Sequence, residues 1–161
     1  MMKKSTILWV AIGLFLANFS AAAQEYLVKS PNGRLKINFY LNPEKAPRYS
    51  IELDGRKVLL ESKLGLIRQD ADFSRNLKLV SVSKPETVRD RYEILTAKRR
   101  LNYYQASRVI FHLQTISGQK MDIIFQVSND GLAFRYFFPE TDGTVYRLAE
   151  ETKQVGIYFV T

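Results

Sequence analysis

The residue types that most often perform covalent catalysis are scarce in this sequence. It has no cysteine, and its single histidine, His112, lies between Phe111 and Leu113 in a strand-like run. A serine nucleophile needs a histidine base, an orienting partner and a G-x-S-x-G turn, and no such turn occurs. We therefore expect His112 to lie on the outer face of a strand and to have no catalytic role.

Metal binding has little support from the residue types. A zinc site needs several Cys or His ligands, which the sequence does not provide. Calcium takes carboxylate and carbonyl oxygens, but there is no D-x-D-x-D-G loop, and Asn129-Asp130-Gly131 is better explained as a turn. We expect no metal site and no cofactor in this chain.

Carboxylates could in principle form the acid pair of a glycosidase, which needs two of them across a cleft. The candidates are Glu52, Glu61, Asp70, Asp72, Glu86, Asp90, Glu93, Asp122 and Asp130. Acidic residues are expected on the exposed faces of any soluble β-protein. Spacing along the sequence therefore selects no pair, and we predict no catalytic residue.

The side chains best suited to binding gather in residues 97–108, AKRRLNYYQASR. Its basic and aromatic members are Lys98, Arg99, Arg100, Tyr103, Tyr104 and Arg108. Such a mixture stacks on sugar rings or nucleobases and also suits a protein interface. A solvated basic segment with its tyrosines anchored in the core is an equally good interpretation.

The elements that would position these residues are strands, because apolar residues alternate with polar ones through most of the chain. Alternation predicts strands at 35–41, 49–53, 56–60, 77–82, 87–95, 109–114, 121–127 and 132–138. Asp54-Gly55 predicts a two-residue hairpin between two of them. For 97–107 we expect an irregular or extended basic segment.

Short strands, close turns and one-sided alternation predict an all-β domain, an antiparallel β-sandwich, with a closed barrel as the alternative. The strands at 109–114, 121–127 and 132–138 are separated by short turns that contain glycine. They are therefore expected to form a meander.

The N-terminal residues 1–23 have the pattern of a secretory signal peptide. Lys3 and Lys4 precede an apolar run at 7–17, and small residues lead to a cleavage site between Ala23 and Gln24. The run is shorter than the ~20 residues of a transmembrane helix. Export without cysteines favours a bacterial periplasm, so we expect a periplasmic or secreted protein with no membrane attachment after cleavage.

The mature chain, 24–161, is expected to be one domain without linkers or repeats. Its net charge falls from +8 to about +6 when the signal is removed. A basic excess fits nucleic acid, anionic lipid or solubility alone. Export makes nucleic acid an unsuitable partner.

Four stretches together resemble the N-terminal domain of glycoside hydrolase family 97. They are YLVKSPNGRLKINFYL (26–41), YSIELDGRKVLLESKLGLI (49–67), DRYEILTAKRRLNYYQASRVIFHL (90–113) and DIIFQVSNDGLAFRYFFPE (122–140). The shared motifs are SPNG, Y-x-I-x-x-DG, S-x-LGL and, most specifically, F-x-V-x-NDG-x-AFRY-x-FPE. Ala97 departs from the pattern, since the family often has glycine before Lys-Arg.

The resemblance implies a β-sandwich of the galactose-mutarotase-like super-sandwich type. It also implies an exported bacterial α-glycosidase, typically an α-glucosidase or α-galactosidase, with a central (β/α)8 barrel and a small C-terminal β domain. Family members hold their catalytic carboxylates, and most ligands of a calcium ion found in some members, on that barrel. No catalytic position carries over to this sequence, and 24–161 is expected to form the first part of a sandwich.

Two functions follow from the resemblance. The first is a non-catalytic sandwich that packs on the barrel and shapes its active site. The second is a stand-alone secreted module that binds an α-linked oligosaccharide or another envelope protein. The residues expected to contact carbohydrate or the neighbouring domain are Arg99, Arg100, Tyr103, Tyr104 and Arg135.

Arg135 lies in the middle of the aromatic strand LAFRYFF, 132–138. Alternation places it with Ala133 and Phe137 on the face opposite Phe134 and Tyr136. Because Phe137 makes that face partly apolar, we expect Arg135 to face a neighbouring domain or sheet and to pair there with a carboxylate or backbone carbonyls.

Overall fold

The computed structural model describes residues 24–95, 100–140, 143 and 145–151. Every regular element within these residues is a strand. The described part of the chain contains no helix long and apolar enough to cross a membrane. The signal peptide expected at 1–23 lies outside the described residues.

The first sheet contains the strands β1 (Tyr26–Lys29), β2 (Leu35–Leu41), β3 (Pro47–Leu53) and β4 (Arg56–Lys63). Its order is β1-β2-β3-β4, and every pair is antiparallel. The predicted hairpin joins β3 to β4, with φ of 52° at Asp54 and 81° at Gly55. Both values are positive, as a two-residue turn of this kind requires.

The second sheet contains β7 (Lys78–Val82), β8 (Glu86–Glu93), β9 (Leu101–Gln114), β10 (Lys120–Ser128) and β11 (Leu132–Phe137). Its order is β11-β10-β9-β7, and β8 also pairs with β9. The antiparallel pairs β9–β10 and β10–β11 confirm the predicted meander.

A small sheet flanks the sandwich with the order β12-β5-β6. Its strands are β5 (Leu66–Arg68), β6 (Ala71–Asp72) and β12 (Leu148–Glu151). These strands, like β1, are missing from the sequence-based prediction. A strand of two to four residues is too short for its alternation of apolar and polar residues to be recognised in the sequence alone.

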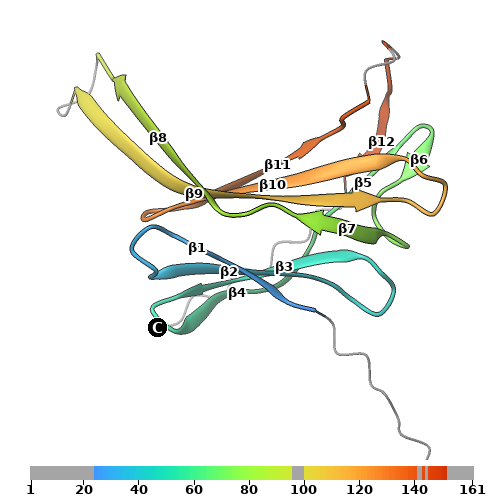
Figure 1. Cartoon of the computed structure of the whole chain (residues 1–161), viewed down its shortest axis with the longest axis horizontal. Helices are drawn as coiled ribbons and strands as arrows, with labels where there is room; N and C mark the ends of the chain where they lie inside the picture. Colours follow the sequence, from blue (N-terminus) through green and yellow to red (C-terminus); the bar gives the residue numbers. More distant parts are fainter. Residues whose placement is uncertain (1–23, 96–99, 141–142, 144, 152–161) are drawn as a thin grey trace, which may run out of the picture.

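The core lies between the first and second sheets, which pack face to face (Figure 1). Alternate residues of the central strands supply it, and their largest fully buried members are Ile37, Phe39, Phe111, Leu113, Met121, Ile123, Phe125 and Val127. Phe39 and Phe111 meet across the sheets with ring centroids 4.1 Å apart. The all-β antiparallel sandwich is therefore confirmed.

One part of the second sheet extends beyond the sandwich and is called the arm here. The arm consists of β8 and the first residues of β9. β10 ends at Ser128, opposite Ala106, so that residues 101–105 of β9 pair with β8 alone. Figure 1 shows the arm bending away from the first sheet. The segment 97–107 is thus extended rather than irregular from Leu101 onward.

Candidate functional site

The 129–131 turn, which lies within the most specific motif, contacts the turn of the SPNG motif. The Oδ1 atom of Asn129 accepts a hydrogen bond of 2.9 Å from the backbone N–H of Asn32. The Oδ1 atom of Asp130 accepts a 2.6 Å bond from the Ser128 hydroxyl, which closes the turn. The bond between Asn129 and Asn32 connects the two sheets at one end of the sandwich.

Tyr136 connects the same motif to the LGL motif. Its hydroxyl oxygen accepts a 2.9 Å hydrogen bond from the backbone N–H of Gly65. Gly65 has φ of +109°, and a Cβ atom there would lie 2.4 Å from the carbonyl oxygen of Phe73. No residue with a side chain fits this position without moving the backbone.

Arg68 is a buried cation, and its side chain is 3% exposed. It forms a bidentate pair with Asp70, at 2.6 and 2.8 Å, and a second ion pair with Glu140 at 2.6 Å. Its guanidinium carbon lies 4.7 Å from the ring centroid of Phe138 and 3.8 Å from that of Tyr146. This Arg68 cluster attaches the chain after β11 to the small sheet.

The electrostatics of the Arg68 cluster favour the charged arginine. The hydrogen bond to Asp70 is the largest influence and raises the pKa of Arg68, and Glu140 raises it further against the opposing effect of burial. Because both carboxylates are used to neutralise one guanidinium, the cluster acts as a structural ion pair network.

The outer face of the second sheet has a different character. Ala133, Arg135 and Phe137 all point outward from β11, as alternation predicted, and Phe137 remains 48% exposed. Arg135 lies opposite Ile124, which in turn lies opposite Ile110. Among the described residues, Arg135 forms no ion pair, so the expected partner in a neighbouring domain stays a prediction.

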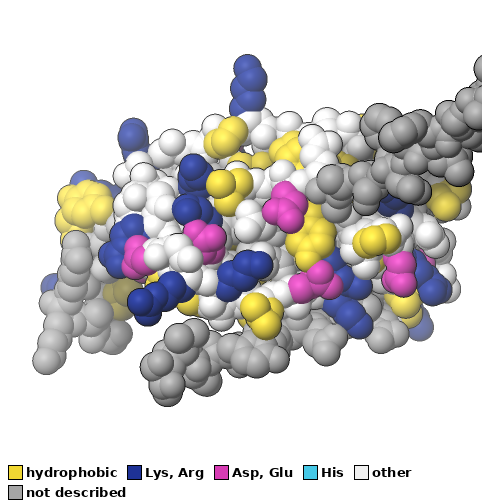
Figure 2. Space-filling view, turned by 90° about the horizontal axis from the view of Figure 1, so that it is seen from below, with side chains coloured by type: hydrophobic (Ala, Val, Ile, Leu, Met, Phe, Trp, Pro, Cys, Tyr) yellow, Lys and Arg dark blue, Asp and Glu magenta, His cyan; other side chains and the backbone are white. Residues whose placement is uncertain are grey.

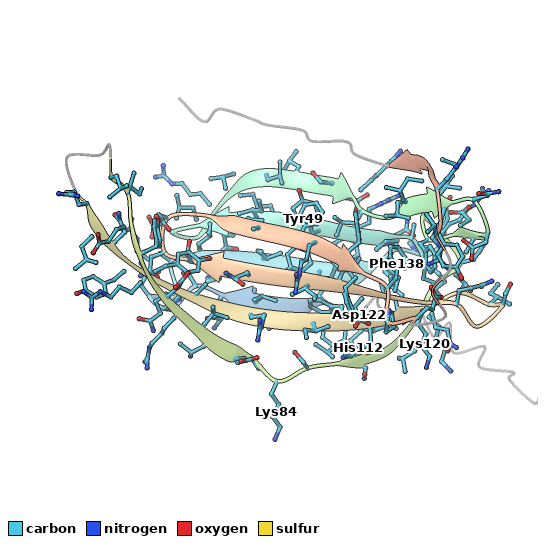
Figure 3. The ribbon with its side chains drawn as sticks, turned by 90° about the horizontal axis from the view of Figure 1, so that it is seen from above. Tyr49, Lys84, His112, Lys120, Asp122 and Phe138 are labelled. Atoms are coloured by element: carbon cyan, nitrogen blue, oxygen red, sulfur yellow. The ribbon has the colours of Figure 1, made fainter. Side chains whose placement is uncertain are left out.

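His112 and Asp122 lie side by side on the same outer face, on β9 and β10 (Figure 3). The Nδ1 atom of His112 is 2.8 Å from Oδ1 of Asp122. The histidine side chain is 41% exposed and the aspartate side chain 12%. His112 therefore lies on the outer face, as expected, but it has a carboxylate partner that the sequence did not predict.

The outer face of the first sheet is covered by charges that pair with one another. Its ion pairs are Arg34–Asp54 at 2.6 Å, Lys36–Glu52 at 2.8 Å and Arg48–Glu61 at 3.3 Å. Figure 2, which views the molecule from below, shows Lys and Arg interleaved with Asp and Glu there. Such a surface is typical of a solvated face.

A recess of about 610 Å³ lies between the arm and the 129–131 turn and is called the arm recess here. Three tyrosines line it: Tyr92, Tyr103 and Tyr104. Its polar lining consists of Arg89, Asp90, Asn102, Gln105, Asn129 and Asp130. Its lining comes from β8, from consecutive residues of β9 and from the 129–131 turn, so the recess lies over the arm beside the end of β10.

Tyr103 and Tyr104, which the sequence placed in one cluster, project to opposite faces of β9. Tyr103 shares its face with Arg91, whose guanidinium carbon is 5.9 Å from the tyrosine ring centroid. Tyr104 lies on the other face, where its hydroxyl accepts a 2.9 Å hydrogen bond from Gln126. Both tyrosines nevertheless belong to the lining of the arm recess.

The basic residues of the predicted cluster are dispersed. Arg99 lies outside the described residues. Arg100 is exposed and does not line the arm recess, while its carbonyl oxygen accepts a 2.8 Å bond from the Ile94 N–H. Arg108 pairs with Glu86 at 2.8 Å on the outer face of the second sheet.

A larger hollow of about 1040 Å³ lies at the other end of the sandwich, near the β9–β10 turn. Its lining includes no Asp, Glu or His, and it adjoins Gln24, where the described chain begins. Within the described ranges, no three His, Asp or Glu side chains are grouped to hold a metal ion. The described residues therefore offer no such group of ligands to calcium.

The sequence did not predict the Arg68 cluster. Its members come from three separate places in the chain, and only Asp70 is a sequence neighbour of the arginine. The FPE end of the most specific motif was the available signal, since it contributes both Phe138 and Glu140.

The chain is similar in sequence to known proteins. A family model described as "Glycosyl-hydrolase 97 N-terminal" matches residues 28–157. A probable retaining alpha-galactosidase of Streptomyces bingchenggensis (strain BCW-1) is 35% identical over 115 residues, which are 71% of this chain and 18% of that protein.

Two solved structures are similar in fold. A beta-arabinopyranosidase matches with a TM-score of 0.77 and 31% identity, over 84% of this chain and 22% of its own. A glycoside hydrolase family 97 enzyme from Pseudoalteromonas sp. strain K8, in complex with panose, matches with a TM-score of 0.72 and 24% identity. That match covers 82% of this chain and 20% of the enzyme. The chain thus spans about a fifth of the length of these relatives.

Proposed function

Because the chain belongs to the glycosyl-hydrolase 97 N-terminal family, we propose that it is the non-catalytic β-sandwich of an exported α-glycosidase. In this proposal residues 1–23 direct export to the periplasm. The sandwich packs on a catalytic (β/α)8 barrel and helps to shape the active site of that barrel.

The observation that carries the proposal is that the inward and outward residues of the most specific motif differ in what they contact. Asn129 contacts the SPNG turn, Tyr136 contacts Gly65, and Glu140 contacts Arg68. Through these contacts, the inward residues of the motif pack within the domain itself. Arg135 and Phe137 remain on the outer face, where a guanidinium beside an exposed ring suits a second protein surface.

The distribution of charged side chains indicates which outer face of the sandwich would contact the barrel. On the outer face of the first sheet, basic and acidic side chains neutralise one another in three ion pairs. The outer face of the second sheet also has paired side chains, Arg108–Glu86 and His112–Asp122, but at β11 it presents Phe137 beside Arg135, which forms no ion pair among the described residues. A barrel surface that offers a carboxylate to Arg135 and apolar contact to Phe137 fits this face.

The carboxylates of the chain support a non-catalytic role. Asp90 and Asp130 both line the arm recess, and both are exposed to solvent. The acid of a glycosidase is normally kept protonated by apolar surroundings, which neither of these residues has. The chemistry is therefore assigned to the barrel.

Hydrolysis assays test the proposal directly. The purified chain should not hydrolyse an aryl α-glucoside or an aryl α-galactoside, and activity should require a barrel polypeptide of the family. Co-purification of the two polypeptides would support packing between them. Turnover by the chain alone, abolished by Asp90→Asn or Asp130→Asn, would overturn the non-catalytic assignment.

A further inference from the structure

The arm recess has no role in the packing proposed above, and its lining has a definite chemistry. Its volume of about 610 Å³ falls within the range of small-molecule sites, roughly 300–1,000 Å³. We propose that the arm recess binds a neutral sugar unit of an α-linked oligosaccharide, as a non-catalytic site separate from any barrel. This inference does not depend on the packing role.

Tyr103 provides the surface on which a sugar ring would stack. Its side chain is 69% exposed although it belongs to a strand, and the guanidinium of Arg91 lies 5.9 Å from its ring centroid. The C–H face of a pyranose carries partial positive charge and matches the negative face of an aromatic ring. A tyrosine ring has only two side-chain torsions, so that ordering it costs little entropy.

The polar groups around Tyr103 match a ligand with many hydroxyls. Gln105 and Asn129 provide amides that both donate and accept, and Asp130 provides an acceptor, while Asp90 lies on the face of the arm that holds Tyr104. Several of these groups are already held in place. Asn129 is fixed by the Asn32 N–H through its Oδ1 atom, and its Nδ2 group can donate to a ligand. Asp130 is fixed by the Ser128 hydroxyl through Oδ1, and its Oδ2 atom can accept from a ligand.

The recess adjoins the edge of β9 that β10 does not cover. Residues 101–105 have β8 on one side and no strand on the other within the described part of the chain. This open edge lies between the arm and the 129–131 turn, the two parts of the chain that line the recess.

Charge favours a neutral ligand over an anionic one. The ionisable residues of the lining are one arginine, Arg89, and two aspartates, Asp90 and Asp130. The small negative excess would repel a phosphate or a uronic acid. Neutral hydroxyls avoid that cost and can accept from Arg89 and donate to either aspartate.

Calorimetric titration of the purified chain with maltotetraose, and separately with an α-galacto-oligosaccharide, tests the inference. We expect saturable binding of at least one of them. Tyr103→Ala and Gln105→Ala should each weaken it, and the loss for Tyr103→Ala should be roughly tenfold. Both side chains are exposed, so circular dichroism should show both variants to be folded.

The matched control is Tyr40→Ala, which removes a tyrosine on the outer face of the first sheet, far from the arm recess. Its affinity for the sugar should equal that of the unmodified chain. A flat titration with both sugars, or unchanged binding by Tyr103→Ala, would overturn the proposal. Protection of amides 101–105 by an added barrel polypeptide, with no sugar binding, would instead identify the open edge as a strand-pairing site.

Discussion

The side chain of Asn129 accepts a hydrogen bond from the backbone of Asn32, 97 residues earlier in the chain. Each residue belongs to a tight turn, one in each sheet, and the bond fixes the two turns against each other. The bond gives Asn129, which looks like an ordinary turn residue, a structural role within the most specific motif of the sequence. Its inward residues continue with contacts to Gly65 and Arg68.

Replacement of Asn129 by alanine should therefore destabilise the fold. Loss of one hydrogen bond to a backbone donor costs about 1 kcal/mol of unfolding free energy. Urea unfolding followed by circular dichroism measures the change. Asn38→Ala, on the outer face of the first sheet, is the control and should stay close to the unmodified chain. Equal midpoints for the two variants would contradict the role given to Asn129.

Gly65→Ala should be much more damaging. The new Cβ atom would meet the Phe73 carbonyl at 2.4 Å, and φ of +109° is strained for any side chain. We expect a loss of roughly 3 kcal/mol or failure to accumulate as soluble protein. Gly33→Ala is the matched control, because φ is +73° but no atom lies within 4 Å of the added Cβ. It should cost about 1 kcal/mol.

Arg68→Met should lower stability by roughly 3 kcal/mol, because it leaves Asp70 and Glu140 without their cation while one carboxylate is only 24% exposed. Arg68→Lys should recover part of the loss, since it restores charge without the bidentate geometry. The comparison is Arg34→Met, which breaks a bidentate pair with Asp54 where the arginine side chain is 62% exposed. Thermal unfolding should show little change for that variant.

Stability should fall in acid through Asp72. Burial alone would raise its pKa, but hydrogen bonds from the Ser74 hydroxyl and N–H, together with Arg75, leave the pKa below the ordinary value of 3.8. A depressed folded-state pKa contributes stability above the unfolded value, and this contribution is lost as pH falls through the folded value.

Urea midpoints measured from about pH 7 to about pH 3 test the Asp72 contribution. Asp72→Asn should lower the midpoint at neutral pH and flatten its decline in acid. A decline as steep as that of the unmodified chain would show that other carboxylates are responsible.

Arg135→Ala should leave the stability of this chain alone within about 0.5 kcal/mol, because the side chain is exposed. In an enzyme that also carries the barrel, the same change should lower both the thermal midpoint and kcat/KM, and Arg135→Lys should restore part of the loss. Arg56→Ala, on the first sheet, is the control. If Arg135→Ala has no effect in that enzyme, the outer face of the second sheet is simply solvated.

Period-two alternation was sufficient to predict the central strands. The residues at 35–41 form a strand with the same bounds in the structure, and Met121, Ile123, Phe125 and Val127 all enter the core. Alternation also separated Arg135 from the core. It was less informative for the outward residues of β10, since Asp122 and Ile124 are only 8% exposed in the middle of a wide sheet.

The residues of the proposed binding site were harder to locate from the sequence, for a physical reason. Tyr103 and Tyr104 are neighbours in sequence, but adjacent residues of a strand face opposite ways. Had 101–107 been recognised as part of a strand, the separation of the two tyrosines would have followed. The arm recess also needs the 129–131 turn beside β9, a proximity that arises from the register between β9 and β10 and leaves no local signal.

β9 is a single strand of 14 residues that begins in the arm and ends in the core. Amide hydrogen exchange reports local opening, which is easiest where few neighbours cover a backbone hydrogen bond. The amides between Leu101 and Gln105 should therefore exchange rapidly with solvent, while those between Val109 and Leu113 should be among the slowest in the domain. The gradient along β9 would measure how far the stability of the sandwich extends into the arm.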